Sequence, residues 1–279
     1  MNSMAKSESS SRIVTSVVAV ISAAALAVSL IAAGFAACAV PDVSTKALAS
    51  VYSTDGASPF TKDELVAAAV QTKHYTIDDN DKAAVYATIA AINAQEALSG
   101  TAGKGAPKID ATANYAAGEL SGEQVAALEA AFDAASERYV LTPDAVSHLD
   151  DVFGVVQAAK WWLLAAVVAA CVGCTATAFR GGKRLLGRVL AGAGVSVLAV
   201  FVLFAAWVAI DFDGFFAQFH SLFFAAGTWT FSWDSLLICM YPPEFWMGMG
   251  AIWLVVTVAC CVVCITIGRL LRKGSTQKR

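Results

Sequence analysis

Long apolar stretches alternate with polar segments along this chain. The apolar stretches are residues 13–40, 153–179, 189–210 and 247–267, and Lys160 is the only charged residue within them. Each is long enough to cross a bilayer as a helix, which takes about 20 apolar residues. The pattern therefore predicts an all-α membrane protein with four transmembrane helices.

The basic residues are distributed unevenly among the polar segments, and this predicts an orientation. Residues 1–12, 180–188 and 268–279 hold more than half of the 19 Lys and Arg and, of the acidic residues, only Glu8. Basic residues in short loops stay on the cytoplasmic side of a membrane. Both termini are therefore expected inside, with residues 41–152 and 211–246 outside.

Together these patterns give a complete division of the chain. In order, we expect a cytoplasmic N-terminus (1–12), a first span (13–40), an extracellular cap (41–152), a second span (153–179), a basic cytoplasmic loop (180–188), a third span (189–210), an extracellular aromatic segment at the membrane surface (211–246), a fourth span (247–267) and a cytoplasmic tail (268–279). Gly192 and Ser196 are small residues one helical turn apart, which predicts close helix packing on that face of the third span.

Helix-start signals recur through the cap. Thr61–Glu64 and Ser121–Gln124 fit the capping box, in which two side chains satisfy free backbone N–H groups. Apolar spacing predicts a helix over about 81–98, with Gly100 as its stop. Thr142-Pro143 starts another helix that continues into the second span. Since no strand alternation stands out, the cap is expected to be mainly helical.

Two sequence features leave alternatives open. Phe35-Ala36-Ala37-Cys38 loosely resembles a lipoprotein cleavage site, although the apolar run around it is longer than a signal peptide core and favours an uncleaved anchor. Cys171-xx-Cys174 and Cys261-xx-Cys264 permit a zinc hypothesis. Thiolates inside lipid carry a large desolvation penalty, so these cysteines are better explained as small packing residues, and we expect no metal.

Composition supports the membrane assignment and excludes one class of partner. The chain is 58% hydrophobic and 15% charged, against about 25% charged residues in an average soluble protein. No basic tract is interleaved with aromatic residues, so we expect no nucleic-acid binding.

The predicted topology brings two of the three histidines toward the outer membrane surface. His148 lies shortly before the second span and His220 shortly after the third. Imidazole can take up and return a proton near neutral pH. Surface ion pairing is the alternative, since Asp144 and Asp151 lie on the same helix face as His148 and either could fix its tautomer. His74 looks like an ordinary surface histidine.

Residues 211–246 combine acids with a high density of aromatic side chains. Asp211 and Asp213 follow the third span, and Asp234 needs a partner if it is buried. The segment has twelve aromatic residues, from which we expect the walls of an acyl-chain pocket, formed by Phe216, Phe219, Phe223, Phe224, Trp229 and Tyr241.

Two segments resemble a bacterial membrane-protein family that includes the lipoprotein intramolecular transacylases. One runs from Asp211-Phe212-Asp213 through Phe219-His220-xx-Phe223-Phe224 and Trp229 to Pro243-Glu244-Phe245, and the other is His148-Leu149-xx-Asp151-Val152. The resemblance implies two catalytic histidines, which map onto His148 and His220. Much of the cap, especially the Ala-rich residues 100–137, has no counterpart that we recognise.

The resemblance also implies a reaction. The sn-2 acyl chain of a diacylglyceryl-modified lipoprotein moves to the α-amine of its N-terminal cysteine, giving the lyso form. Because the attacking amine is part of the substrate, neither a cofactor nor an enzyme nucleophile is needed, and two imidazoles suffice for proton transfer. Either Tyr241 or Trp229 is a candidate donor to the oxyanion.

Two other functions compete with this one. A non-enzymatic membrane protein whose extracellular cap binds a partner would tolerate loss of both histidines. A transporter is disfavoured by the small number of spans, the absence of an internal repeat and the lack of mid-span charge.

Overall fold

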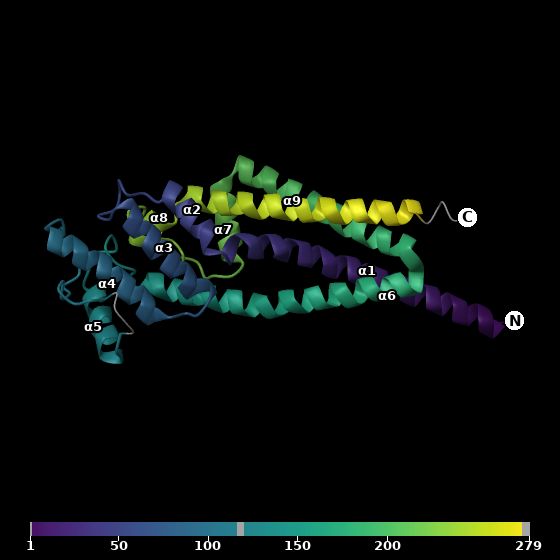
Figure 1. Ribbon diagram of the computed structural model, residues 1–279, viewed down its shortest axis with the longest axis horizontal. Coiled ribbons are helices and arrows are strands. Elements are labelled where there is room, and N and C mark those ends of the chain that lie inside the picture. Colours follow the sequence, from purple (N-terminus) through teal and green to yellow (C-terminus); the bar gives the residue numbers. More distant parts are fainter. Residues whose placement is uncertain (1, 116–119, 275–279) are drawn as a thin grey trace. The chain divides into compact units, whose positions relative to one another are not determined.

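The computed structural model describes residues 2–115 and 120–274, and within these residues all regular structure is helical. The helices are α1 (Asn2–Ala39), α2 (Asp42–Tyr52), α3 (Lys62–Ile77), α4 (Lys82–Ser99), α5 (Gly122–Asp133), α6 (Pro143–Ile210), α7 (Phe212–Ser221), α8 (Leu236–Met240) and α9 (Pro243–Gly274) (Figure 1). The predicted all-α class is confirmed. Lys278 and Arg279 of the expected tail lie outside the described residues.

The chain forms two compact units. Unit 1 comprises residues 1–37, 158–215 and 252–279, and unit 2 comprises residues 38–157 and 216–251. Unit 1 therefore holds the apolar parts of the long helices, whereas unit 2 holds the short helices.

Among the described residues, three helices are long and apolar enough to cross a membrane, namely α6, α9 and the Ser9–Ala39 part of α1. With 68 residues α6 is far longer than one span. Its helical backbone breaks at Gly182, where φ is 70° and ψ is 179°. The chain doubles back there (Figure 1), because glycine reaches positive φ without a steric penalty.

Small residues set the helix contacts inside unit 1. A Cβ on Gly173 would lie 2.3 Å from Ser22 Oγ, and one on Gly187 would lie 2.5 Å from the Gly268 carbonyl oxygen. Gly194 is similarly close to Ile265. A Cβ on Gly192, by contrast, would meet no neighbouring atom within 4 Å, so the close approach uses Gly187 and Gly194 instead of the predicted Gly192 face.

Large apolar side chains cover the outside of the long helices. Trp162 is 78% exposed and Ile210 is 86% exposed, and Val202 and Leu203 are also open. A soluble protein rarely leaves so much contiguous apolar surface uncovered. The same surface is ordinary where lipid is the solvent.

The helix starts of unit 2 follow the sequence signals closely. Thr61 and Ser121 each complete a capping box, at the starts of α3 and α5. Asp81 caps α4, which ends at Gly100 with φ of 73° in the left-handed region. The Thr142 hydroxyl oxygen accepts from Ala145 N–H at 3.3 Å and starts α6.

The segment after α7 is anchored in the core of unit 2. Leu236 N–H donates to the Glu137 carbonyl at 2.7 Å, and Thr54 N–H donates to the Cys239 carbonyl at 2.9 Å. Leu236, Met240 and Phe245 are almost completely buried. The expected aromatic loop is therefore built around two short helices, α7 and α8, and its later half belongs to the core of unit 2.

Candidate active site: a histidine pair in an aromatic shell

His148 lies in the first turns of α6, before the apolar stretch that begins at Phe153. Its neighbours Ala145, Val146 and Leu149 are buried in the core of unit 2. His148 itself is only 8% exposed. The helix start at Thr142 thus fixes this imidazole at the edge of an apolar core.

His220 occupies the last turn of α7. Its Nδ1 lies 2.9 Å from the carbonyl oxygen of Phe216. Because a carbonyl oxygen can only accept, Nδ1 must carry the hydrogen. Nε2 of the neutral ring then has a lone pair, which is what a general base needs.

The two histidines face each other within unit 2. Their ring centroids are 6.3 Å apart, with 29° between the ring planes. The ring centroid of Phe224 lies 4.9 Å from that of His148 and 5.7 Å from that of His220, so one phenyl ring touches both imidazoles. The meeting expected from topology is therefore present in the structure.

Further aromatic rings surround the pair. The ring centroid of Phe216 is 4.0 Å from that of His220, with Trp229 at 4.9 Å and Phe219 at 5.9 Å. Phe223 contacts Phe219 and Phe224 and forms an outer layer. Five of the six predicted pocket residues thus gather around the histidines.

The aromatic surroundings keep both imidazoles neutral. Burial, and to a smaller extent the nearby His220, lowers the pKa of His148 from its ordinary 6.5 to about 4, against the opposing charge of Asp151. Burial also lowers the pKa of His220, against the opposing hydrogen bond to Phe216. At neutral pH both rings are therefore available as proton acceptors.

Two buried polar atoms at the site have no hydrogen-bond partner among the described residues. They are Nδ1 of His148 and Nε1 of Trp229. A buried unpaired polar group costs about 1–3 kcal/mol, and most such groups are satisfied. One of these atoms belongs to the histidine pair and the other lies beside it, so a polar group of a ligand would satisfy either of them.

Tyr241 differs from expectation. Its hydroxyl donates to the Ala69 carbonyl, and its ring packs on Phe245 and Trp246 at 4.8 and 5.7 Å between centroids. Burial raises the pKa of this phenol far above its usual range. Tyr241 is a core residue whose hydroxyl is already engaged, so Trp229 remains as the candidate oxyanion donor.

The predicted supporting carboxylates separate into three groups. Asp151 acts on His148 through its charge, and since Nδ1 of His148 is unpaired, neither Asp144 nor Asp151 orients the ring through that atom. Asp211 and Asp213 lie in unit 1, where Asp211 caps α7 by accepting from Gly214 N–H at 2.8 Å.

Asp234 forms the third group and has the partners that its environment requires. It accepts from the Ser232 hydroxyl at 2.7 Å and lies 3.4 Å from the Arg138 guanidinium. Arg138 also donates to the Ala57 carbonyl at 3.1 Å. The sequence prediction missed Arg138, although the partner required by Asp234 was a usable signal.

Phe231 is a second residue that the sequence prediction missed. Its ring centroid lies 5.7 Å from that of His148. It is one of many aromatic residues in the segment, and spacing alone does not distinguish it from Trp233, which is 72% exposed.

His74 belongs to a different cluster in unit 2. Asp42, His74 and Asp78 hold ligand-type atoms within 4.8 Å of one another, and among the described residues this trio is the one with metal-like spacing. The Lys73 ammonium already lies 3.0 Å from Asp42 and 2.9 Å from Asp78. The cluster is therefore an ion-pair network instead of a metal site.

The fold and the site together define a class of protein: a helical membrane protein with a buried histidine pair in an apolar shell. Residues 111–246 match the family model of the lipoprotein intramolecular transacylase Lit. This segment, which contains both histidines, is therefore similar to the lipoprotein intramolecular transacylase family. The family's activity is that of an acyltransferase.

Solved structures of the membrane-integral transacylase Lit from Bacillus cereus share the fold. A variant with a histidine-to-alanine change has a TM-score of 0.63 at 15% identity, covering 95% of this chain and 96% of that one. A histidine-to-arginine variant has a TM-score of 0.61 at 15% identity and covers 99% and 100%. No curated protein sequence matches this chain.

Proposed function

We propose that this chain transfers the sn-2 acyl chain of a diacylglyceryl lipoprotein to the α-amine of its N-terminal cysteine. The single observation that carries the catalytic part is the pair His148 and His220, 6.3 Å apart and both held neutral by burial. The family match supports the reaction class.

The proton inventory of this reaction suits two imidazoles. The amine attacks the ester carbonyl and loses a proton, and the C–O bond to the glyceryl C2 oxygen then breaks. That oxygen leaves as an alkoxide and must gain a proton. The products are an amide and a free hydroxyl, so the exchange balances without a cofactor.

The tautomer of His220 favours it as the base. With Nδ1–H donated to Phe216, Nε2 accepts the proton from the attacking amine. His148, whose pKa is about 4, is a weaker base, and its conjugate acid is correspondingly a stronger acid. We assign His148 the hydrogen bond to the departing glyceryl oxygen, through its unpaired ring nitrogen.

Trp229 supplies the donor that the tetrahedral intermediate needs. Its indole N–H is buried and has no partner among the described residues, and its ring lies 4.9 Å from that of His220. A fixed donor aimed at the developing oxyanion requires no reorganisation during the reaction. An intermediate bound beside His220 would satisfy this N–H.

The topology proposed here has four membrane spans in a bacterial cytoplasmic membrane, both termini inside and the cap outside. The break at Gly182 supports the division of α6 into two spans. Figure 1 adds that the start of α1, the turn within α6 and the end of α9 lie at one end of unit 1, as a shared cytoplasmic side requires. The substrates are diacylglyceryl lipoprotein N-termini embedded in the same bilayer.

Mass spectrometry of lipoprotein N-termini tests the proposal. The full chain is expressed in a host whose lipoproteins carry a diacylglyceryl group and a free α-amine. We expect N-acyl, S-monoacylglyceryl termini with the wild-type chain and unchanged termini with His148→Ala or His220→Ala. If both variants still produce the lyso form, the histidine mechanism fails, and if the wild type produces none, the activity itself does.

A further inference from the structure

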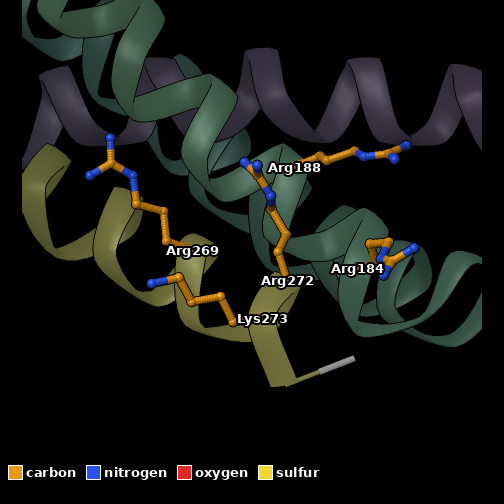
Figure 2. A pocket seen from close by; sticks show the side chains of 5 residues that line it. All are labelled: Arg184, Arg188, Arg269, Arg272 and Lys273. Atoms are coloured by element: carbon orange, nitrogen blue, oxygen red, sulfur yellow. The ribbon is translucent and has the colours of Figure 1, made fainter. Parts of the chain in front are cut away.

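Five cationic side chains of unit 1 surround one pocket, far in sequence from the histidine pair. The pocket has a volume of about 360 Å³. Figure 2 shows the side chains that line it. They come from the part of α6 that follows Gly182 (Arg184 and Arg188) and from the end of α9 (Arg269, Arg272 and Lys273).

A glycine contact brings these charges together. A Cβ on Gly187 would lie 2.5 Å from the Gly268 carbonyl oxygen, and a Cβ on Gly268 would lie 2.6 Å from the Gly187 carbonyl oxygen. The two backbones therefore touch, and Arg188 and Arg269 are the next residues along each helix. Basic residues that only set the orientation of the chain in the membrane would not need such close contact between the two helices.

Neither helix stretch carries acidic side chains to offset the charge. Residues 152–210 and 245–279 contain no Asp or Glu. The charge contributed by these two stretches is therefore purely positive where they meet. Like charges gathered in this way repel each other, and a bound anion would turn that repulsion into attraction.

We propose that this pocket binds the phosphate group of an anion. Arginine guanidinium groups match phosphate oxygens with two parallel hydrogen bonds, and lysine adds a point charge. The proposed topology places the pocket at the cytoplasmic membrane surface, where basic pockets between helices hold anionic lipid headgroups. The same chemistry would accept free phosphate, and the experiment below separates these two sources.

The test uses the full chain purified in detergent. Native mass spectrometry compares the binding of phosphatidylglycerol with that of phosphatidylcholine, and thermal unfolding compares inorganic phosphate with chloride at equal ionic strength. The pocket variant is Arg188→Gln with Arg269→Gln. The matched control is Arg180→Gln with Lys183→Gln, which removes the same charge from exposed positions outside the pocket.

If a lipid is the source, the wild type binds phosphatidylglycerol over phosphatidylcholine, the pocket variant loses roughly 30-fold in affinity, and the control loses less than about 3-fold. If free phosphate is the source, phosphate alone raises the melting temperature of the wild type and of the control, but not of the pocket variant. Equal losses of affinity in the pocket variant and in the control would overturn the proposal. So would a wild type that prefers neither phosphatidylglycerol over phosphatidylcholine nor phosphate over chloride.

A second variant guards against misfolding. Lys273→Gln removes one pocket charge and leaves the helix contact intact, so it should weaken binding by a smaller factor in the same direction. All of these residues belong to unit 1, whereas both histidines belong to unit 2. The transacylase activity of every variant in neutral detergent should therefore remain at the wild-type level.

Discussion

The two histidine clusters of unit 2 contrast sharply. His74 Nε2 lies 3.0 Å from Asp42 and its Nδ1 lies 3.9 Å from Asp78, so both ring nitrogens face carboxylates. Hydrogen bonds from Lys73, and then from His74, lower the pKa of Asp42. His148, in contrast, faces His220, Phe224 and Phe231, and its Nδ1 has no partner among the described residues.

The difference separates the histidine that we propose to be catalytic from a structural one. Carboxylate neighbours satisfy the ring of His74 and leave nothing for a ligand to complete. The aromatic shell around His148 keeps the ring neutral and leaves a polar atom unpaired. The unpaired Nδ1 of His148, more than the presence of a histidine, identifies the candidate site.

Removing the two histidines proposed to be catalytic should give the largest effect. His148→Ala and His220→Ala are each expected to lower the rate of N-acylation by about 10²–10⁴-fold, because each positioned imidazole contributes on that scale to proton transfer. Single-turnover kinetics on a diacylglyceryl lipopeptide in detergent measure this. His74→Ala is the matched control and should stay within about twofold of wild type.

The double variant sharpens the comparison. If the pair works as a unit, losing both histidines should cost hardly more than losing the worse single one. Fully multiplicative losses would show that the two rings act in separate steps. A large loss in His74→Ala would contradict the contrast between the clusters.

The sequence predicted much of this arrangement because local signals were strong. Thr61, Ser121 and Thr142 start helices through their own side chains, and Gly100 ends one through its own backbone. The proximity of His148 and His220 followed from the positions of the apolar stretches. Short-range physics and bilayer thickness were enough for these features.

Features that depend on how the helices pack could not be predicted from these local signals. Gly192 and Gly187 look alike in the sequence, but only the structure shows which face of the helix meets α9. Tyr241 and Trp229 were equal candidates until the hydroxyl of Tyr241 was found on the Ala69 carbonyl. In both cases the neighbouring residue in the folded structure, which the sequence does not reveal, decided between the candidates.

Acid should destabilise the protein through the same aromatic shell. The pKa of His148 is about 4 in the folded protein and near 6.5 when unfolded, so the unfolded chain binds more protons between these values. Stability contributed by the neutral ring is therefore present above pH 6.5 and is lost as the pH falls toward 4. The expected loss is up to about 3 kcal/mol.

Thermal unfolding of the detergent-solubilised chain between pH 4 and 8 measures this effect. His148→Gln should flatten the acid limb, whereas His74→Gln should change it far less. Part of the slope should persist in His148→Gln, because burial lowers the pKa of His220 as well. An identical slope in wild type and His148→Gln would contradict the buried neutral state.

Trp229→Phe tests the second unpaired atom. It keeps an aromatic ring beside His220 but removes the indole N–H, and loss of one oxyanion donor costs about 10²-fold in kcat. KM and the pH profile should change little, since the donor acts on the intermediate. Trp233→Phe, at a 72% exposed position of the same segment, is the control and should leave kcat unaltered.

The smallest effect is expected at the Arg138–Asp234 pair, which holds the site segment instead of reacting. Its side chains are 48% and 25% exposed, and partly exposed pairs contribute at most about 1 kcal/mol. Asp234→Asn should therefore lower stability by that amount or less and lower activity only a few-fold, through displacement of the segment that carries Trp229. Arg138→Gln should behave alike, and the double variant should add little because both single changes break the same contact.

Glu129→Gln, which breaks the comparable Lys82–Glu129 pair at 3.5 Å, is the matched control and should affect stability without affecting activity. A hundredfold loss of activity in Asp234→Asn with normal stability would instead place this carboxylate among the groups that move protons, beside the two histidines.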